Sequence, residues 1–185
     1  MPPVDLIAAA TVADNWGDGV NLALLLMRVV VGITLAAHGY NKFFGGGRIP
    51  GTASWFDSMG MKPNGRVHAI LAASTEMGAG ILFALGLLTP LAAAGFVGLM
   101  VVAAWTVHRH NGFFIVKDGW EYNMVLAVVA VGIAVIGPGE LSLDWALGLD
   151  FSFAPITAFV MSAVLGLAGG IGLLALCYRP PASSD

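Results

Sequence analysis

Long segments with almost no charge constrain this chain more than any other feature. Five mostly apolar segments occupy residues 22–38 (extending to 43), 67–87, 91–107, 124–136 and 156–178. A membrane-spanning helix needs roughly 20 mostly apolar residues. The segments therefore predict an all-α polytopic membrane protein with five transmembrane helices, in which a four-helix bundle is followed by a fifth, C-terminal helix.

The composition excludes several other classes of protein. Only 10% of the residues are charged and 58% are hydrophobic, whereas a soluble domain carries about 25% charged residues. A formal net charge of -3 leaves no basic face for nucleic acid. The lone Cys177 excludes an intrachain disulfide framework and a Cys-rich metal site. We expect no metal and no nucleic-acid partner.

The loop cations predict the orientation of the chain. Seven of the eight Lys and Arg residues lie between or after the apolar segments, all on one side if five helices cross the membrane: Lys42, Arg48, Lys62, Arg66, Arg109, Lys117 and Arg179. Cytoplasmic loops carry an excess of such residues. We therefore expect a multi-pass protein of the cell (plasma) membrane, with residues 1–21 extracytoplasmic or interfacial, residues 22–150 as the bundle, residues 151–178 as the fifth helix, and residues 179–185 as a cytoplasmic tail.

Two charged residues fall inside predicted helices. Arg28 lies roughly 9 Å and Glu76 roughly 16 Å below the predicted outer face, at about 1.5 Å per residue, so their side chains are within reach of each other. One interpretation is a salt bridge that fixes the register of two helices. The other is a proton-handling or substrate-facing carboxylate, because ionisable groups in a membrane mark such pathways.

A second polar cluster is predicted at the inner end of the helices. His38 and Lys42 share a helix face because they are four residues apart, and His108 lies at the same depth as His38, roughly 24 to 26 Å. The cluster predicts catalytic roles for His38, His108 and Glu121, beside the separate catalytic candidate Glu76, and binding of a quinone or a lipid headgroup by His38, Lys42, His108, Asn111 and Tyr122. In the alternative interpretation, Lys42 extends to lipid phosphates and the cluster is structural.

Two smaller patterns concern packing. Small residues recur at Gly95 with Gly98 and at Gly166 with Gly169 and Gly170, which favours close packing within the bundle over a dedicated dimer face. A short interfacial helix is predicted near residues 52–59, where apolar bulk stands among polar residues.

Several runs, taken in order, resemble the DoxX family of small membrane proteins. They are His38-Gly-Tyr-Asn-Lys42-Phe-Phe-Gly, Gly51-Thr-Ala-Ser-Trp-Phe, Glu76-Met-Gly-Ala-Gly, Gly86-Leu-Leu-Thr-Pro90, His108 through Asn111-Gly-Phe-Phe to Glu121-Tyr122, and Gly137-Pro-Gly-Glu-Leu-Ser-Leu-Asp144. The resemblance covers residues 22–147, and it rests on the order and spacing of the runs.

The resemblance implies a four-helix membrane bundle. It also implies a quinone-linked role, because the family is named with small subunits of thiosulfate:quinone oxidoreductase. The positions that carry over are Arg28, His38, Lys42, Glu76, His108 and Glu121. The added fifth helix and acidic N-terminal segment depart from the family pattern and favour docking to other membrane or redox subunits.

Three functions follow from these observations. The first is a membrane subunit of a redox complex that binds a quinone and has its catalytic centre on another chain; the protein itself has no intrinsic cofactor. The second is a non-enzymatic accessory or assembly subunit. The third is a small proton-coupled transporter that uses Glu76, which the absence of an evident inverted repeat disfavours.

Overall fold

The computed structural model describes residues 6–149 and 154–181, and these residues form helices and short connections without a named strand. The elements are α1 Leu6–Phe44, α2 Arg48–Ser58, α3 Gly65–Leu85, α4 Thr89–Ala103, the π-helical turn η1 Ala104–His108, the 3-10 turns η2 Arg109–Asn111 and η3 Ile115–Lys117, α5 Glu121–Ile136, α6 Leu143–Ala146, α7 Pro155–Phe159, the π-helical turn η4 Val160–Val164, and α8 Leu165–Cys177. The all-α prediction is confirmed.

Local sequence signals set several helix ends. The Asn64 side chain accepts a hydrogen bond from the amide of Val67 and so caps α3, as expected of an Asn N-cap. α3 ends at Gly86, which adopts a left-handed conformation with φ 64°, and Gly is the residue that adopts it without strain. Pro90 lies in the first turn of α4, where its missing N–H costs nothing. The predicted break between these two helices is therefore confirmed.

Four helical stretches among the described residues are long and apolar enough to cross a membrane. They are Gly17–Phe44, Gly65–Leu85, Thr89–Asn111 and Pro155–Cys177. The chain is thus a multi-pass membrane protein, and its C-terminal helix meets the length that a crossing requires. The remaining apolar helix, α5, has 16 residues, somewhat short of the roughly 20 that span a bilayer.

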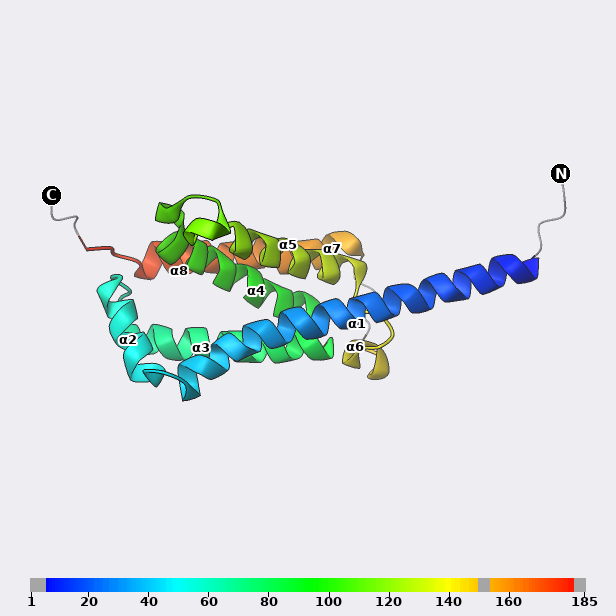
Figure 1. Ribbon diagram of the computed structural model, residues 1–185, viewed down its shortest axis with the longest axis horizontal. Helices are drawn as coiled ribbons and strands as arrows, with labels where there is room; N and C mark the ends of the chain where they lie inside the picture. Colours follow the sequence, from blue (N-terminus) through cyan, green and yellow to red (C-terminus); the bar gives the residue numbers. More distant parts are fainter. Residues whose placement is uncertain (1–5, 150–153, 182–185) are drawn as a thin grey trace.

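The long helices run along one axis, and the two ends of the bundle differ (Figure 1). At one end α2 lies across the other helices, which agrees with the short helix predicted near residues 52–59. At the other end α1 projects beyond the bundle. Its 39 residues make it about 59 Å long. The helix begins at Leu6, 16 residues before the predicted start at position 22.

Helix α4 occupies the centre of the bundle, packed on α3, α5 and α8. Phe83 and Phe96 meet between α3 and α4 with ring centroids 5.2 Å apart. A Cβ on Gly98 would lie 3.3 Å from the carbonyl oxygen of Gly166, and one on Gly170 would lie 2.9 Å from that of Gly98. Small residues therefore let α4 and α8 approach closely, as predicted for packing within the bundle.

Glycines also set the register of α1 against α3. A Cβ on Gly32 would lie 2.5 Å from the carbonyl oxygen of Gly80, and one on Gly39 would lie 2.6 Å from that of Ala73. Seven residues along α1 thus correspond to seven along α3, in the opposite direction. A larger residue at either position would clash with the facing backbone, so the two glycines are needed for this close approach. This register decides which interior charges meet.

Candidate functional site

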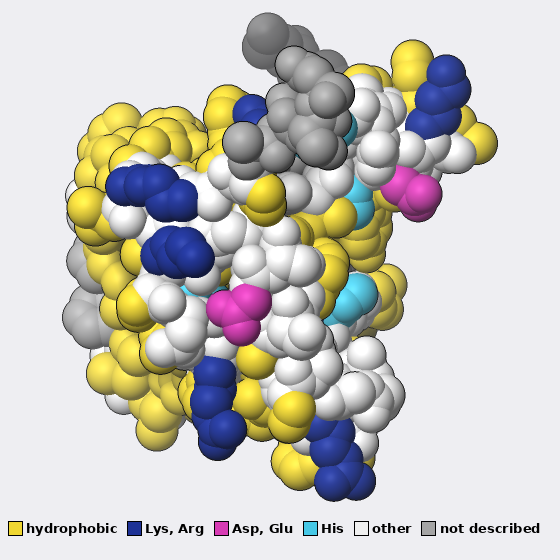
Figure 2. All heavy atoms as spheres, turned by 90° about the vertical axis from the view of Figure 1, so that its left-hand side faces the viewer, with side chains coloured by type: hydrophobic (Ala, Val, Ile, Leu, Met, Phe, Trp, Pro, Cys, Tyr) yellow, Lys and Arg dark blue, Asp and Glu magenta, His cyan; other side chains and the backbone are white. Residues whose placement is uncertain are grey.

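Lys and Arg side chains gather at the end of the bundle that carries α2 (Figure 2). The ends of α1 and α8, the start of α3 and the connection between α4 and α5 all lie at this end. We call it the cationic end. The seven cations predicted to share one side do share one end of the molecule.

A cavity of about 340 Å³ opens near the cationic end between α1, α3, α4 and α5, with α2 beside it. Its volume falls within the range of small-molecule sites, roughly 300 to 1,000 Å³. We call it the polar pocket, and its polar lining consists of Thr34, His38, Lys42, Glu76, Thr106, His108, Tyr122 and Asn123. Four residues of the predicted inner cluster, His38, Lys42, His108 and Tyr122, therefore meet in one cavity, and Glu76, which was expected to pair with Arg28, joins them.

Lys42 and Glu76 form a salt bridge in the wall of this pocket. The Lys42 Nζ lies 2.7 Å from both Oε1 and Oε2 of Glu76. The Lys42 side chain is 19% exposed and the Glu76 side chain 13% exposed, so each charged group is largely shielded from solvent. An ammonium group has three donors, and the pair engages at most two, which leaves one for a molecule in the pocket.

The predicted Arg28–Glu76 pair is wrong, because Lys42 takes the carboxylate and Arg28 lies elsewhere. The depth estimate assumed that α1 enters the bundle at Leu22, level with the end of α3. In the register fixed by Gly32 and Gly39, Arg28 instead lies beside the last turn of α3, where its Nη1 donates to the Ala84 carbonyl oxygen over 3.2 Å. Lys42, two turns beyond Leu35, is the cation that reaches Glu76.

Arg28 joins the turn between α3 and α4 to the segment that leads into α6. Its side chain is fully buried, and its Nη2 donates to the Leu141 carbonyl oxygen over 2.6 Å. Nearby, the Asp144 carboxylate accepts hydrogen bonds from the Leu88 amide and from the amide and hydroxyl of Thr89. These contacts bind the end of the bundle opposite the cationic end, and Arg28 does not line the polar pocket.

His108 reaches the pocket from a π-helical turn. Residues 104–108 form η1, which continues α4 with a wider turn; such turns are frequent at functional sites. The Nδ1 of His108 lies 2.7 Å from the Asp118 carbonyl oxygen. Since a carbonyl only accepts, Nδ1 carries the proton, and Nε2 is the nitrogen left to exchange a hydrogen bond or a proton with a ligand.

Besides Arg28, two predicted residues, Glu121 and Asn111, lie outside the pocket lining. The Glu121 Oε2 accepts a hydrogen bond from the Ile115 amide over 2.9 Å, and the Asn111 Nδ2 donates to the Asp118 carbonyl oxygen over 3.2 Å. Both side chains therefore hold the connection between α4 and α5, the segment that also positions His108.

Sequence reasoning missed several residues of the site. Asn123 is buried beside the pocket, and its Nδ2 is 3.6 Å from the sulfur of Met100. Trp55 and Phe56 of α2, which stack with centroids 5.3 Å apart, add an aromatic wall. Two signals in the sequence could have identified them. Asn123 is a polar residue in the first turn of an apolar helix, and Trp55 and Phe56 are an aromatic pair among polar residues. Among residues 6–149 and 154–181, no three His, Cys, Asp or Glu side chains converge as a metal-binding group.

Comparison with known proteins gives the chain a family context. The DoxX family model matches residues 23–109, which run from α1 to η2 and include four of the five predicted residues that line the polar pocket, His38, Lys42, Glu76 and His108. A protein of Bacillus subtilis (strain 168) named "Putative oxidoreductase CatD" is 30% identical over 123 residues, which cover 66% of this chain and 85% of that protein. No solved structure matches the chain.

Proposed function

Because this chain belongs to the DoxX family, we propose that it is a membrane subunit of a quinone-linked redox complex. The observation that carries the proposal is the polar pocket, in which two histidines, a lysine, a carboxylate and a phenol meet inside an apolar bundle. The oxidoreductase name of the bacterial relative supports a redox role. The pocket supplies hydrogen bonds for the head of a quinone, and the surrounding helices supply an apolar environment for the rest of the molecule.

Reduction of a quinone to a quinol adds two electrons and two protons. We assign the protons to the pocket, where His38 and the Nε2 of His108 hold and release them; an imidazole suits this role because it can both accept and donate a proton. The free donor of Lys42 faces the carbonyl that becomes more negative as electrons arrive, and Glu76 keeps Lys42 in place. In this proposal the electrons enter from a partner subunit that carries the catalytic centre.

The proposed arrangement in the membrane has five crossings. The cationic end lies on the cytoplasmic side of the plasma membrane, because cytoplasmic loops carry the excess of Lys and Arg. The N-terminus is then outside, and α5, although short, crosses beside α4 with Gly137 and Pro138 at its end. This orientation puts the polar pocket near the cytoplasmic headgroups, where protons are available.

Quinone binding by the purified protein tests the proposal. A His38→Ala, His108→Ala variant should bind a benzoquinone at least tenfold more weakly than wild type, the effect of about 1.4 kcal/mol. His110→Ala is the matched control, since His110 is exposed and does not line the pocket. Wild-type affinity in the double variant would remove the proposed site, and copurification of a redox partner would support the complex.

An accessory or assembly role is the second candidate, and the Lys42–Glu76 salt bridge is the observation that favours it. A salt bridge that only locks α1 on α3 needs no ligand. If this candidate is correct, variants of Lys42 or Glu76 lose activity only to the extent that they lose stability. A proton-coupled transporter would instead show proton-dependent flux in reconstituted vesicles.

A further inference from the structure

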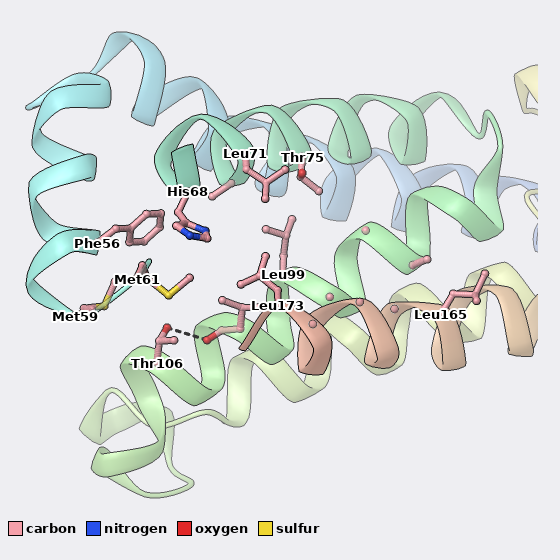
Figure 3. Close-up of a pocket in the computed structure, with 18 residues that line it drawn as sticks. Phe56, Met59, Met61, His68, Leu71, Thr75, Leu99, Thr106, Leu165 and Leu173 are labelled. Atoms are coloured by element: carbon pink, nitrogen blue, oxygen red, sulfur yellow. Dashed lines mark hydrogen bonds between the residues drawn. The ribbon is translucent and has the colours of Figure 1, made fainter. Parts of the chain in front are cut away.

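A second cavity, of about 270 Å³, lies between α2, α3, α4 and α8 (Figure 3). We call it the apolar cavity. Leucines, methionines and the glycines at 95, 98, 166, 169 and 170 make up most of its wall. Apolar cavities of about 150 Å³ already bind benzene, so this one has room for a larger hydrocarbon group.

The mouth of the apolar cavity faces the bilayer. α3 and α8 each pack on α4 rather than on each other, which leaves a gap along α4. Leu71 on α3 and Leu165 on α8 line the cavity and are exposed. A molecule dissolved in the membrane can therefore enter sideways between the two helices.

Polar groups occur mainly at the end of the apolar cavity near α2. His68 is buried and points into the cavity between Phe56 and Leu99 (Figure 3). Its Nε2 lies 2.6 Å from the Lys62 carbonyl oxygen, so Nε2 carries the proton and Nδ1 is an acceptor. The cavity thus grades from a polar end, at the cationic end of the bundle, to a hydrocarbon end at Leu165.

One layer of side chains separates the two cavities. Phe56, Ala72, Leu99, Val102 and Thr106 line both. Ala72 contributes only a methyl group, and Phe56, from α2 at the end of the bundle, is the largest of the five. Phe56 therefore lies at the boundary between the two cavities.

We propose that the apolar cavity holds the isoprenoid or alkyl tail of the quinone whose head lies in the polar pocket. The inference rests on the proposed function and narrows its substrate class to quinones with a hydrophobic tail. Three observations carry it: the wall shared with the polar pocket, the exposed leucines at the opening, and the mostly apolar lining. Phe56 is then the residue past which the tail runs.

Gly169 offers a selective test. It lines the apolar cavity, and a Cβ there would meet nothing within 4 Å, so Gly169→Leu adds bulk at the cavity wall without a backbone clash. Gly172 is on the same helix, has equally open surroundings and lines neither cavity. Gly172→Leu therefore controls for the change in helix propensity. Equal elution profiles in detergent establish that both variants fold.

The probes are a benzoquinone with a decyl tail and the same headgroup without a tail. Wild type should prefer the decyl compound, and Gly169→Leu should weaken its binding about tenfold or more, the contribution of two buried methylene groups. Binding of the tailless compound should not change, and Gly172→Leu should behave as wild type for both.

Other outcomes overturn the inference in distinguishable ways. Wild-type affinity of Gly169→Leu for the decyl compound removes the tail site but leaves the head site. Binding of neither compound by wild type removes both the proposed function and the tail site. If Gly169→Leu loses only a copurified phospholipid, detected by native mass spectrometry, while its affinity for the decyl compound is unchanged, the cavity holds a lipid acyl chain instead.

Discussion

The Lys42–Glu76 salt bridge allows stability and function to be separated. Replacing one partner leaves the other charge uncompensated, which costs about 3 to 5 kcal/mol for a buried pair. Both side chains retain some exposure, and Lys42 is one turn from the end of α1, so its ammonium can extend outward. We therefore expect Glu76→Gln and Lys42→Met each to lower the free energy of unfolding by about 2 kcal/mol, below that buried-pair value.

The expected shifts are large enough to measure. For a chain of this size, 1 kcal/mol corresponds to roughly 2 to 4 °C, so each single variant should unfold about 4 to 8 °C below wild type in detergent. The Lys42→Met, Glu76→Gln double variant leaves no charge, and most of the lost stability should return. The double-mutant cycle then gives the coupling between the two side chains. Lys117→Met, an exposed cation at the same end, should unfold as wild type.

Quinone affinity of the same variants distinguishes the two interpretations of the pair. If Lys42 donates to the quinone, the double variant regains stability and still binds quinone weakly. If the pair only locks the helices, stability and binding return together. Single variants that unfold at the wild-type temperature, with effects that add in the double variant, would refute the argument that the two charges compensate each other.

Three further predictions concern packing and orientation. Asp144→Ala should lower the free energy of unfolding by about 2 kcal/mol, because the amide and hydroxyl of Thr89 lose a charged acceptor, and thermal unfolding checks this. Gly39→Ala should lower the free energy of unfolding by about 1 to 3 kcal/mol, because the added methyl group overpacks against α3. Gly78→Ala, which has open surroundings, should instead raise it by up to about 1 kcal/mol. If the unfolding midpoints of both variants shift in the same direction, the close approach of α1 and α3 at Gly39 is contradicted. Cys177 at the cationic end should react with a membrane-impermeant maleimide in inside-out vesicles and remain unlabelled in right-side-out vesicles.

Hydropathy was sufficient to predict the helices, because a bilayer demands length and apolarity from each crossing segment. It was not sufficient to predict where α1 begins, since the helix continues through Asp14 and Asp18 into residues that lack an apolar signal. The depth of Arg28 was wrong for a separate reason: the estimate set Leu22 level with Leu87, whereas the helix register places Arg28 beside Ala84. Register depends on which glycines meet between two helices, and such contacts have no signature in one helix alone.

The error in depth did not change the prediction that His38 and His108 share one site. Its lining on α1 extends from Thr34 to Lys42, more than two turns, so a displacement of several residues still left His38 beside His108. The Arg28 contacts were harder to predict, because Leu141 lies 113 positions along the chain in an irregular segment. Predictions about a broad polar site therefore succeed more easily than predictions about one salt bridge.

The partners of the interior charges distinguish structural from functional groups. Arg28 is fully buried, and its hydrogen bonds go to backbone carbonyl oxygens, so it has no access to a ligand. Lys42 and Glu76 also have short contacts with each other, yet both line a cavity that His38 and His108 line as well. A pair kept only for helix register would need no such cavity, and filling the space with apolar side chains would avoid the cost of burying its charges. The retained cavity therefore favours a role in binding for the Lys42–Glu76 pair and a structural role for Arg28.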